Sequence, residues 1–103
     1  VYSIILTMNK TSLLFKLSVI FLREGDSFIA YSPALDLSTS ASSFEKTRSR
    51  FIEAAKIFFE EVIKKETLDE VLQELGWQKH NKEWRPPLIV SQETESIRIP
   101  VVL

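Results

Sequence analysis

The sequence has no cysteine, one histidine and two glycines, and each shortage excludes a class of site. Without cysteine the chain forms neither disulfides nor thiolate metal sites, a composition that fits a reducing cytoplasm. The single histidine, His80, lies in a polar stretch typical of a surface loop and has no second histidine to share a metal ion. Two glycines, Gly25 and Gly76, are too few for a phosphate-cradling loop, and no nucleophile elbow of the hydrolase type exists. We therefore expect no metal site and no cofactor.

Long apolar runs and a strong excess of one charge are also missing. The most apolar stretches, residues 1–8 and 13–22, fall short of the roughly 18–20 residues of a membrane helix. No basic residue precedes the first stretch, unlike in a secretory signal. The net charge of −1 argues against a protein that holds nucleic acid or an anionic membrane by bulk electrostatics. The sequence therefore predicts a cytoplasmic protein without membrane association.

The length of 103 residues and the hydrophobic content of 45% fit one domain with a single core. We assign this domain to residues 11–103 and treat residues 1–10 as an N-terminal extension. For residues 1–7 the alternative is a short strand that adds to a sheet edge.

Alternating apolar residues predict strands in the first half of the chain. Residues 13–23 place Leu13, Phe15, Leu17, Val19 and Phe21 on one wholly apolar face. Gly25-Asp26 is typical of a two-residue hairpin loop, which would set Phe21 opposite Ala30 and Leu22 opposite Ile29. Proline gives no ladder donor, so Pro33 should end the second strand. Residues 35–38 then predict a third strand, with Asp36 between two core leucines.

Two capping-box patterns predict helices in the second half. Residues 42–45, Ser-Ser-Phe-Glu, place a cap at Ser42 and a helix that runs to about Lys65. Its inward stripe is predicted to comprise Phe44, Phe51, Ala55, Phe58 and Val62. Ile57 falls among the polar positions, either as a harmless exposed side chain or as a contact with a second subunit. Residues 67–70, Thr-Leu-Asp-Glu, open a short second helix that should end at Gly76 in the left-handed conformation.

Residues 77–87 contain two tryptophans around a turn at Asn81. Bases between aromatic residues can bind single-stranded nucleic acid, but we favour a small hairpin whose tryptophans close the core. Residues 97–102 predict a last strand at a sheet edge, because Pro100 lacks a ladder donor. The whole pattern predicts an α+β fold of order β-β-β-α-α-β, in which a three- to four-stranded antiparallel sheet carries one long and one short helix.

The stretch Ala30-Tyr31-Ser32-Pro33-Ala34-Leu35 resembles the HicB-like antitoxin domain, whose second strand runs into Ala-Tyr-x-Pro-Ala-Leu. Residues 67–77, TLDEVLQELGW, resemble one branch of that family, and the likeness covers roughly residues 13–103. The resemblance implies a partial ribonuclease H-like fold, with Ala30, Tyr31, Pro33, Ala34 and Leu35 as the motif residues.

The resemblance also implies a role in a toxin–antitoxin system. Such a domain is not catalytic; it oligomerises and sequesters a small mRNA-cleaving toxin of the HicA type, a basic protein partner. After Trp84 no helix pattern of a DNA-binding module follows, so we do not expect direct DNA binding. Tyr31, Asp36 and Ile57 are the candidates for partner binding.

Two alternatives stay open. One is an orphan oligomeric domain that serves as a scaffold. The other is a diminished nuclease that uses Asp36 with Glu24 or Asp26 and a divalent metal. Two-metal nucleases hold their ions roughly 3.5–4 Å apart among several inward acids, and one strand carboxylate is weak evidence for such a site. We therefore predict no catalytic residues and no enzymatic activity.

Overall fold

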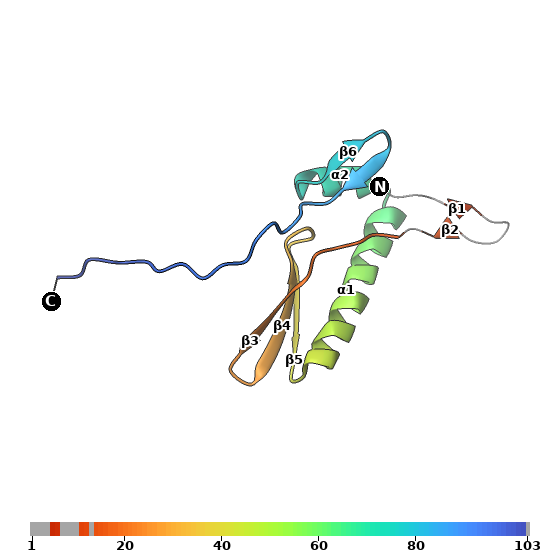
Figure 1. Cartoon of the computed structure of the whole chain (residues 1–103). Coiled ribbons are helices and arrows are strands. Elements are labelled where there is room, and N and C mark those ends of the chain that lie inside the picture. Colours follow the sequence, from red (N-terminus) through yellow and green to blue (C-terminus); the bar gives the residue numbers. More distant parts are fainter. Residues whose placement is uncertain (1–4, 7–10, 13, 103) are drawn as a thin grey trace.

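The computed structural model describes residues 5–6, 11–12 and 14–102, so the predictions for residues 1–4, 7–10 and Leu13 lie outside it. It confirms the α+β class: a three-stranded antiparallel sheet of order β3-β4-β5 carries a long helix on one face, with a short helix and a hairpin beyond it (Figure 1). The elements are β1 (Ile5–Leu6), β2 (Thr11–Ser12), β3 (Ile20–Glu24), β4 (Ser27–Ser32), β5 (Leu37–Ala41), α1 (Phe44–Lys64), α2 (Leu68–Glu74), β6 (Gln78–His80) and β7 (Glu83–Arg85). β1 and β2 pair with each other in a separate two-stranded sheet.

The hairpin of β3 and β4 has the predicted register, with Phe21 opposite Ala30 and Leu22 opposite Ile29. Gly25 occupies the first loop position with φ +59°, a conformation that glycine adopts without steric cost. The predicted strand over residues 13–23 is too long, because β3 begins only at Ile20. β4 ends at Ser32 and the chain turns, so residues 14–19 have no strand opposite them in the described ranges. The apolar face was correctly predicted, since Phe15, Leu17 and Val19 pack against the core.

The third strand begins two residues later than predicted. Residues 33–36 form a turn, in which the Leu35 amide donates to the Ser32 carbonyl at 3.3 Å. Asp36 has φ +50° and so lies in the left-handed region, which a strand cannot accommodate. The placement of Asp36 inside a strand was therefore wrong. Leu35 is buried and Leu37 packs against the core, as expected of both.

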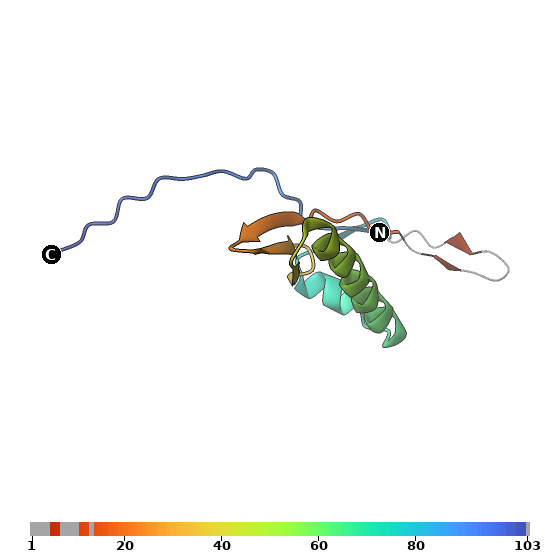
Figure 2. The same cartoon turned by 90° about the horizontal axis from the view of Figure 1, so that it is seen from below.

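Helix α1 covers β4 and β5 on one face of the sheet (Figure 2). Its cap is Ser43, whose Oγ accepts a hydrogen bond from the Lys46 amide at 3.2 Å, one residue after the predicted Ser42. The predicted inward stripe is also partly wrong, because Phe44 is exposed and Phe59 is buried more deeply than Phe58. The buried positions of α1 are Thr47, Phe51, Ala55, Phe59 and Val62.

The predicted stop at Gly76 is confirmed. Gly76 has φ +89°, its amide donates to the Gln73 carbonyl, and the Trp77 amide donates to the Leu72 carbonyl. This is the Schellman pattern of a helix end. Thr67 occupies the cap position of α2 but makes no side-chain cap bond, so the second capping box was wrong in that detail.

A hairpin of β6 and β7 follows α2. Asn81 and Lys82 form its loop, both with positive φ, as a type I′ turn requires. Trp77 and Trp84 are buried, 4% and 7% exposed, which confirms the core role over a stacking platform for nucleic acid.

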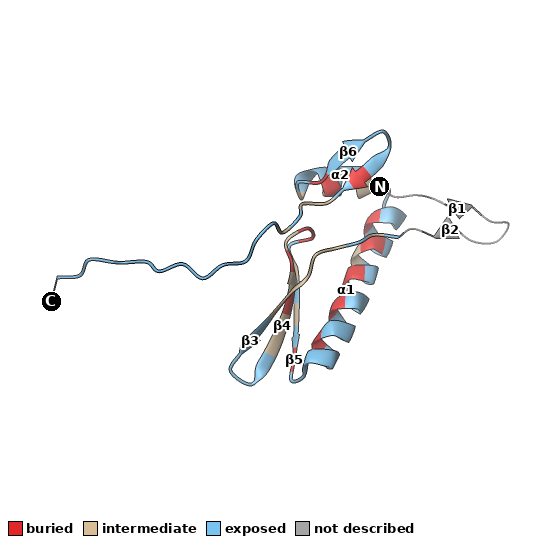
Figure 3. Ribbon diagram, viewed as in Figure 1, coloured by how far each residue is buried: buried red, intermediate tan, exposed pale blue. Residues whose placement is uncertain are grey.

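Beyond the hairpin, residues 86–102 form no strand in the structure, and the chain runs outward from the body (Figures 1 and 2). This tail gives the molecule its longest dimension, in extents of 69 × 32 × 22 Å. The predicted strand over residues 97–102 is therefore not formed, and it has no partner strand among the residues that the structure describes. The buried residues lie in the sheet and the turn after β4, on the inner side of α1, in α2 and the following Trp77, and in the hairpin, while the tail is exposed from residue 90 onward (Figure 3).

Candidate functional site

The motif stretch 30–36 divides into a buried part and a surface part. Ala30, Ala34 and Leu35 are almost completely buried. The indole Nε1 of Trp77 donates a hydrogen bond of 2.8 Å to the Ala34 carbonyl, across 43 residues of sequence. The hydrogen bond therefore joins the stretch 30–35 to the end of the segment 67–77. Their buried residues fix the turn that follows β4.

Tyr31 and Asp36 form the surface part. The Tyr31 hydroxyl donates a hydrogen bond to the Asp36 Oδ1 at 3.0 Å. Asp36 accepts this bond from the last position of the turn, where its backbone is left-handed. The carboxylate accepts the phenol proton in a hydrogen bond and so raises the pKa of Tyr31, with smaller contributions from desolvation and charge. Two of the three predicted partner-binding residues thus lie together.

Strand alternation defines the surface around this pair. Ala30 and Ser32 point toward α1 and are fully buried, so Ile29 and Tyr31 point to the other side of the sheet. The register places Leu22 beside Ile29 and Ile20 beside Tyr31. We call this side the open face, made by Ile20, Leu22, Ile29 and Tyr31 and continued on β5 by Ser38 and Ser40.

The open face combines apolar and acidic groups. Leu22 is 52% exposed at its centre, and Glu24 and Asp36 lie toward its two ends. None of the β3, β4 and β5 side chains that alternation assigns to this face is basic. Sequence reasoning named Tyr31 and Asp36 but missed the apolar cluster. The signal was present, because Ile20 and Leu22 alternate with the core-facing residues of the same strand.

Ile57, the third predicted contact, lies elsewhere. It is 57% exposed on α1, next to Arg50, Glu53 and Ala54, and α1 covers the side of the sheet opposite the open face. The structure therefore does not bring Ile57 together with Tyr31 and Asp36.

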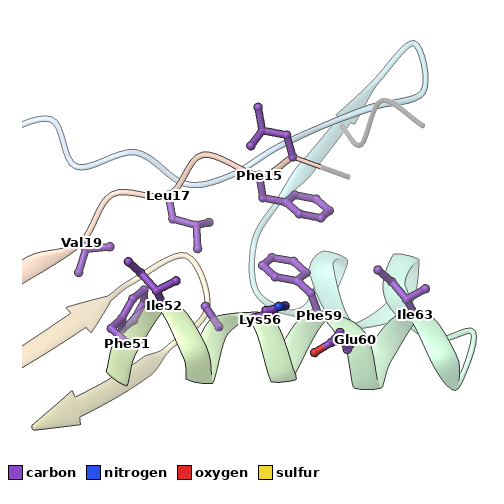
Figure 4. Close-up of a pocket in the computed structure, with 11 residues that line it drawn as sticks. Phe15, Leu17, Val19, Phe51, Ile52, Lys56, Phe59, Glu60 and Ile63 are labelled. Atoms are coloured by element: carbon purple, nitrogen blue, oxygen red, sulfur yellow. The ribbon is translucent and has the colours of Figure 1, made fainter. Parts of the chain in front are cut away.

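A separate apolar groove of about 840 Å³ runs between residues 14–19 and one flank of α1 (Figure 4). Phe15 on one side of the groove stacks on Phe59 of α1 on the other, with ring centroids 4.1 Å apart. Ile52 and Ile63 lie on the helix side with exposed side chains, 52% and 41%. This groove was not predicted, because it depends on where residues 14–19 cross α1.

The carboxylates of the nuclease alternative lie apart. Glu24 and Asp26 are at the hairpin end of β4, whereas Asp36 follows its other end. The six residues of β4 separate them, a length of about 20 Å at the usual rise per residue. In the described part of the chain, no group of three or more histidine, cysteine, aspartate or glutamate side chains could hold a metal ion.

Compared with models of protein families, with curated proteins and with solved structures, this chain has no match. Within the described ranges, neither helix has the length and apolar character needed to cross a membrane.

Proposed function

We propose that this chain is a non-catalytic, antitoxin-like binding protein that sequesters a small basic protein, an mRNA-cleaving toxin of the HicA type, on the open face. The observation that carries the proposal is the composition of that face: an exposed apolar centre between two acidic ends, without a basic side chain. Exposed apolar clusters with polar borders are typical of protein interaction sites. Acidic borders favour encounter with a basic partner and disfavour an acidic one.

The buried contacts of the motif support the same proposal. Trp77 holds the Ala34 carbonyl, which fixes the turn over residues 33–36. This turn holds Asp36 in contact with the Tyr31 hydroxyl at the end of the open face. The buried motif residues therefore act as positioning residues for the surface pair. A pre-formed surface loses less conformational entropy when it binds a partner.

The test is affinity purification of the tagged chain from its native host, with retained proteins identified by mass spectrometry. We expect a small basic protein, encoded beside this chain, whose RNA cleavage stops when the chain is added. Leu22→Glu should weaken this complex by roughly tenfold or more, because a charge replaces the apolar centre.

Ile57→Glu is the matched control, because Ile57 has nearly the same exposure but lies on the outer surface of α1. It should leave the complex intact. If the Leu22→Glu protein retains the partner and the Ile57→Glu protein loses it, the binding surface lies on α1 and not on the open face. Absence of any co-purifying small basic protein would remove the antitoxin role.

A further inference from the structure

The exposed tail has the side-chain pattern of a strand. Ile97, Ile99 and Val101 alternate with Arg98 and Pro100, and these three apolar side chains are 71–76% exposed. A lone extended segment of this kind leaves both its backbone groups and its apolar side unpaired. We therefore expect the tail to pair with a sheet edge that has an apolar surface beside it.

The body of the molecule offers such an edge. β3 is the terminal strand of the sheet, and residues 14–19 extend its path without a neighbouring strand. Phe15, Leu17 and Val19 from this path line the apolar groove opposite Ile52 and Ile63 of α1 (Figure 4). A strand added beside β3 would direct alternate side chains toward this groove.

One antiparallel register matches both apolar pattern and charge. If Ile97 lies opposite Phe21, then Ile99 lies opposite Val19 and Val101 opposite Leu17. The same register sets Glu95 opposite Arg23, an opposite-charge pair that favours strand association. In a parallel arrangement with Ile97 opposite Val19, Val101 would face Arg23 and Glu95 would face Leu17. Pro100 suits the new strand, because that strand would itself be the outer edge.

The chain's own tail is poorly placed to supply this antiparallel strand. The tail leaves the body beside Gly76 and Trp77, and Trp77 binds the turn that follows β4. β3 begins at that end of the sheet, because Ile20 pairs with Tyr31. A tail that starts there runs in the same direction as β3 unless it reverses. Residues 88–96 contain no glycine, proline, asparagine or aspartate, and serines, which favour a tight reversal more weakly, are the turn residues present there.

We propose that two copies of this chain exchange their tails, so that residues 95–101 of each copy form an antiparallel fourth strand on the β3 edge of the other. Ile97, Ile99 and Val101 then cover the groove beside Ile52 and Ile63. The exchange is reciprocal, as twofold symmetry requires of an isologous dimer. It leaves Leu22, Ile29 and Tyr31 of the open face uncovered and adds Arg98 beside Ile20 at the margin of that face. The exchange holds whether or not the open face binds a toxin.

The first test is the oligomeric state of the full chain, measured by sedimentation across a dilution series. We expect a dimer, and Ile99→Glu should raise its dissociation constant at least roughly tenfold by placing a charge in the groove. Val102→Glu is the matched control, because Val102 is equally part of the tail but alternates to the other side. A wild-type monomer, or equal effects of the two substitutions, would overturn the proposal.

The second test identifies the copy that supplies the strand. The chain has no cysteine, so Leu22→Cys and Ser96→Cys, which the register sets opposite each other, introduce the only thiols. Mixing the two single variants under oxidation should give a disulfide-linked dimer of one copy of each. If only the Ser96→Cys protein links to itself, the tails pair with each other. A variant that carries both cysteines is the comparison. If it forms a disulfide within one chain and the mixture gives no linked dimer, the tail pairs with β3 of its own chain. Either result overturns the exchange.

Discussion

Two hydrogen bonds to residues 30–36 are similar in length but differ in burial and in the distance along the sequence that they span. The bond from Trp77 Nε1 to the Ala34 carbonyl is 2.8 Å long and buried, whereas the bond from the Tyr31 hydroxyl to Asp36 is 3.0 Å long and exposed. A buried bond cannot be replaced by water, so its loss leaves an unsatisfied group in the core. An exposed bond is readily replaced. The comparison indicates that the first bond determines stability and the second shapes a surface.

The largest effect on stability is expected at Trp77. Trp77→Ala removes a buried indole that contacts Phe15 and Phe59 and also leaves the Ala34 carbonyl without its donor. The free energy of unfolding should fall by about 3–5 kcal/mol, as for other large-to-small substitutions of buried aromatic residues. Urea unfolding followed by circular dichroism measures this loss.

Trp77→Phe keeps an aromatic ring and removes the donor, so it should lower the free energy of unfolding by about 1–3 kcal/mol. A loss below 1 kcal/mol for Trp77→Ala would contradict the central role of this contact.

An intermediate effect is expected at Thr47, a buried threonine that links α1 to the sheet. Its hydroxyl donates to the Ser43 carbonyl at 2.7 Å and also lies 3.1 Å from the Phe28 carbonyl. Thr47→Val keeps the shape of the side chain and removes the hydroxyl, at a cost of about 1–3 kcal/mol in unfolding free energy.

Ser32→Ala is the control for Thr47, because the Ser32 hydroxyl is also buried but has no hydrogen-bond partner in the described part of the structure. Its removal should leave the urea midpoint unchanged or raise it. Equal losses at the two positions would show that the hydroxyl bonds of Thr47 contribute nothing specific.

Local signals explain what could be predicted from the sequence. The loop at Gly25-Asp26 determines the register of β3 and β4, and the residue pattern around Gly76 determines the end of α2. The cap of α1 was misplaced by one residue because Ser42 and Ser43 are both able to cap, and only the path of the preceding chain selects Ser43.

Long-range contacts explain what could not be predicted. The length of β3 depends on where β4 ends, and Phe59 is buried because Phe15 stacks on it from a distant segment. For the candidate site, sequence reasoning named Tyr31 and Asp36 as separate candidates. Their contact requires the left-handed turn at Asp36, and this turn is fixed by Trp77 from outside the motif.

The smallest effect on stability is expected at Tyr31. Tyr31→Phe removes only an exposed hydrogen bond, so the free energy of unfolding at neutral pH should stay close to the wild-type value. The bond to Asp36 raises the pKa of Tyr31 in the folded protein above that of the unfolded chain. The folded state therefore favours the protonated phenol. Its contribution is fully present below the ordinary tyrosine pKa of about 10 and is lost as the pH rises through the folded pKa.

Tyrosinate absorbance during an alkaline titration tests this assignment. Tyr31→Phe gives the titration of Tyr2 alone, so its subtraction from the wild-type curve isolates Tyr31. Asp36→Asn should then lower the pKa of Tyr31 toward its ordinary range, because the carboxylate that accepts the phenol proton is gone. An unchanged titration of Tyr31 in Asp36→Asn would mean that the two side chains do not interact in solution. In that event Tyr31 would not hold Asp36 at the end of the open face, while the buried bond from Trp77 to Ala34 would be unaffected.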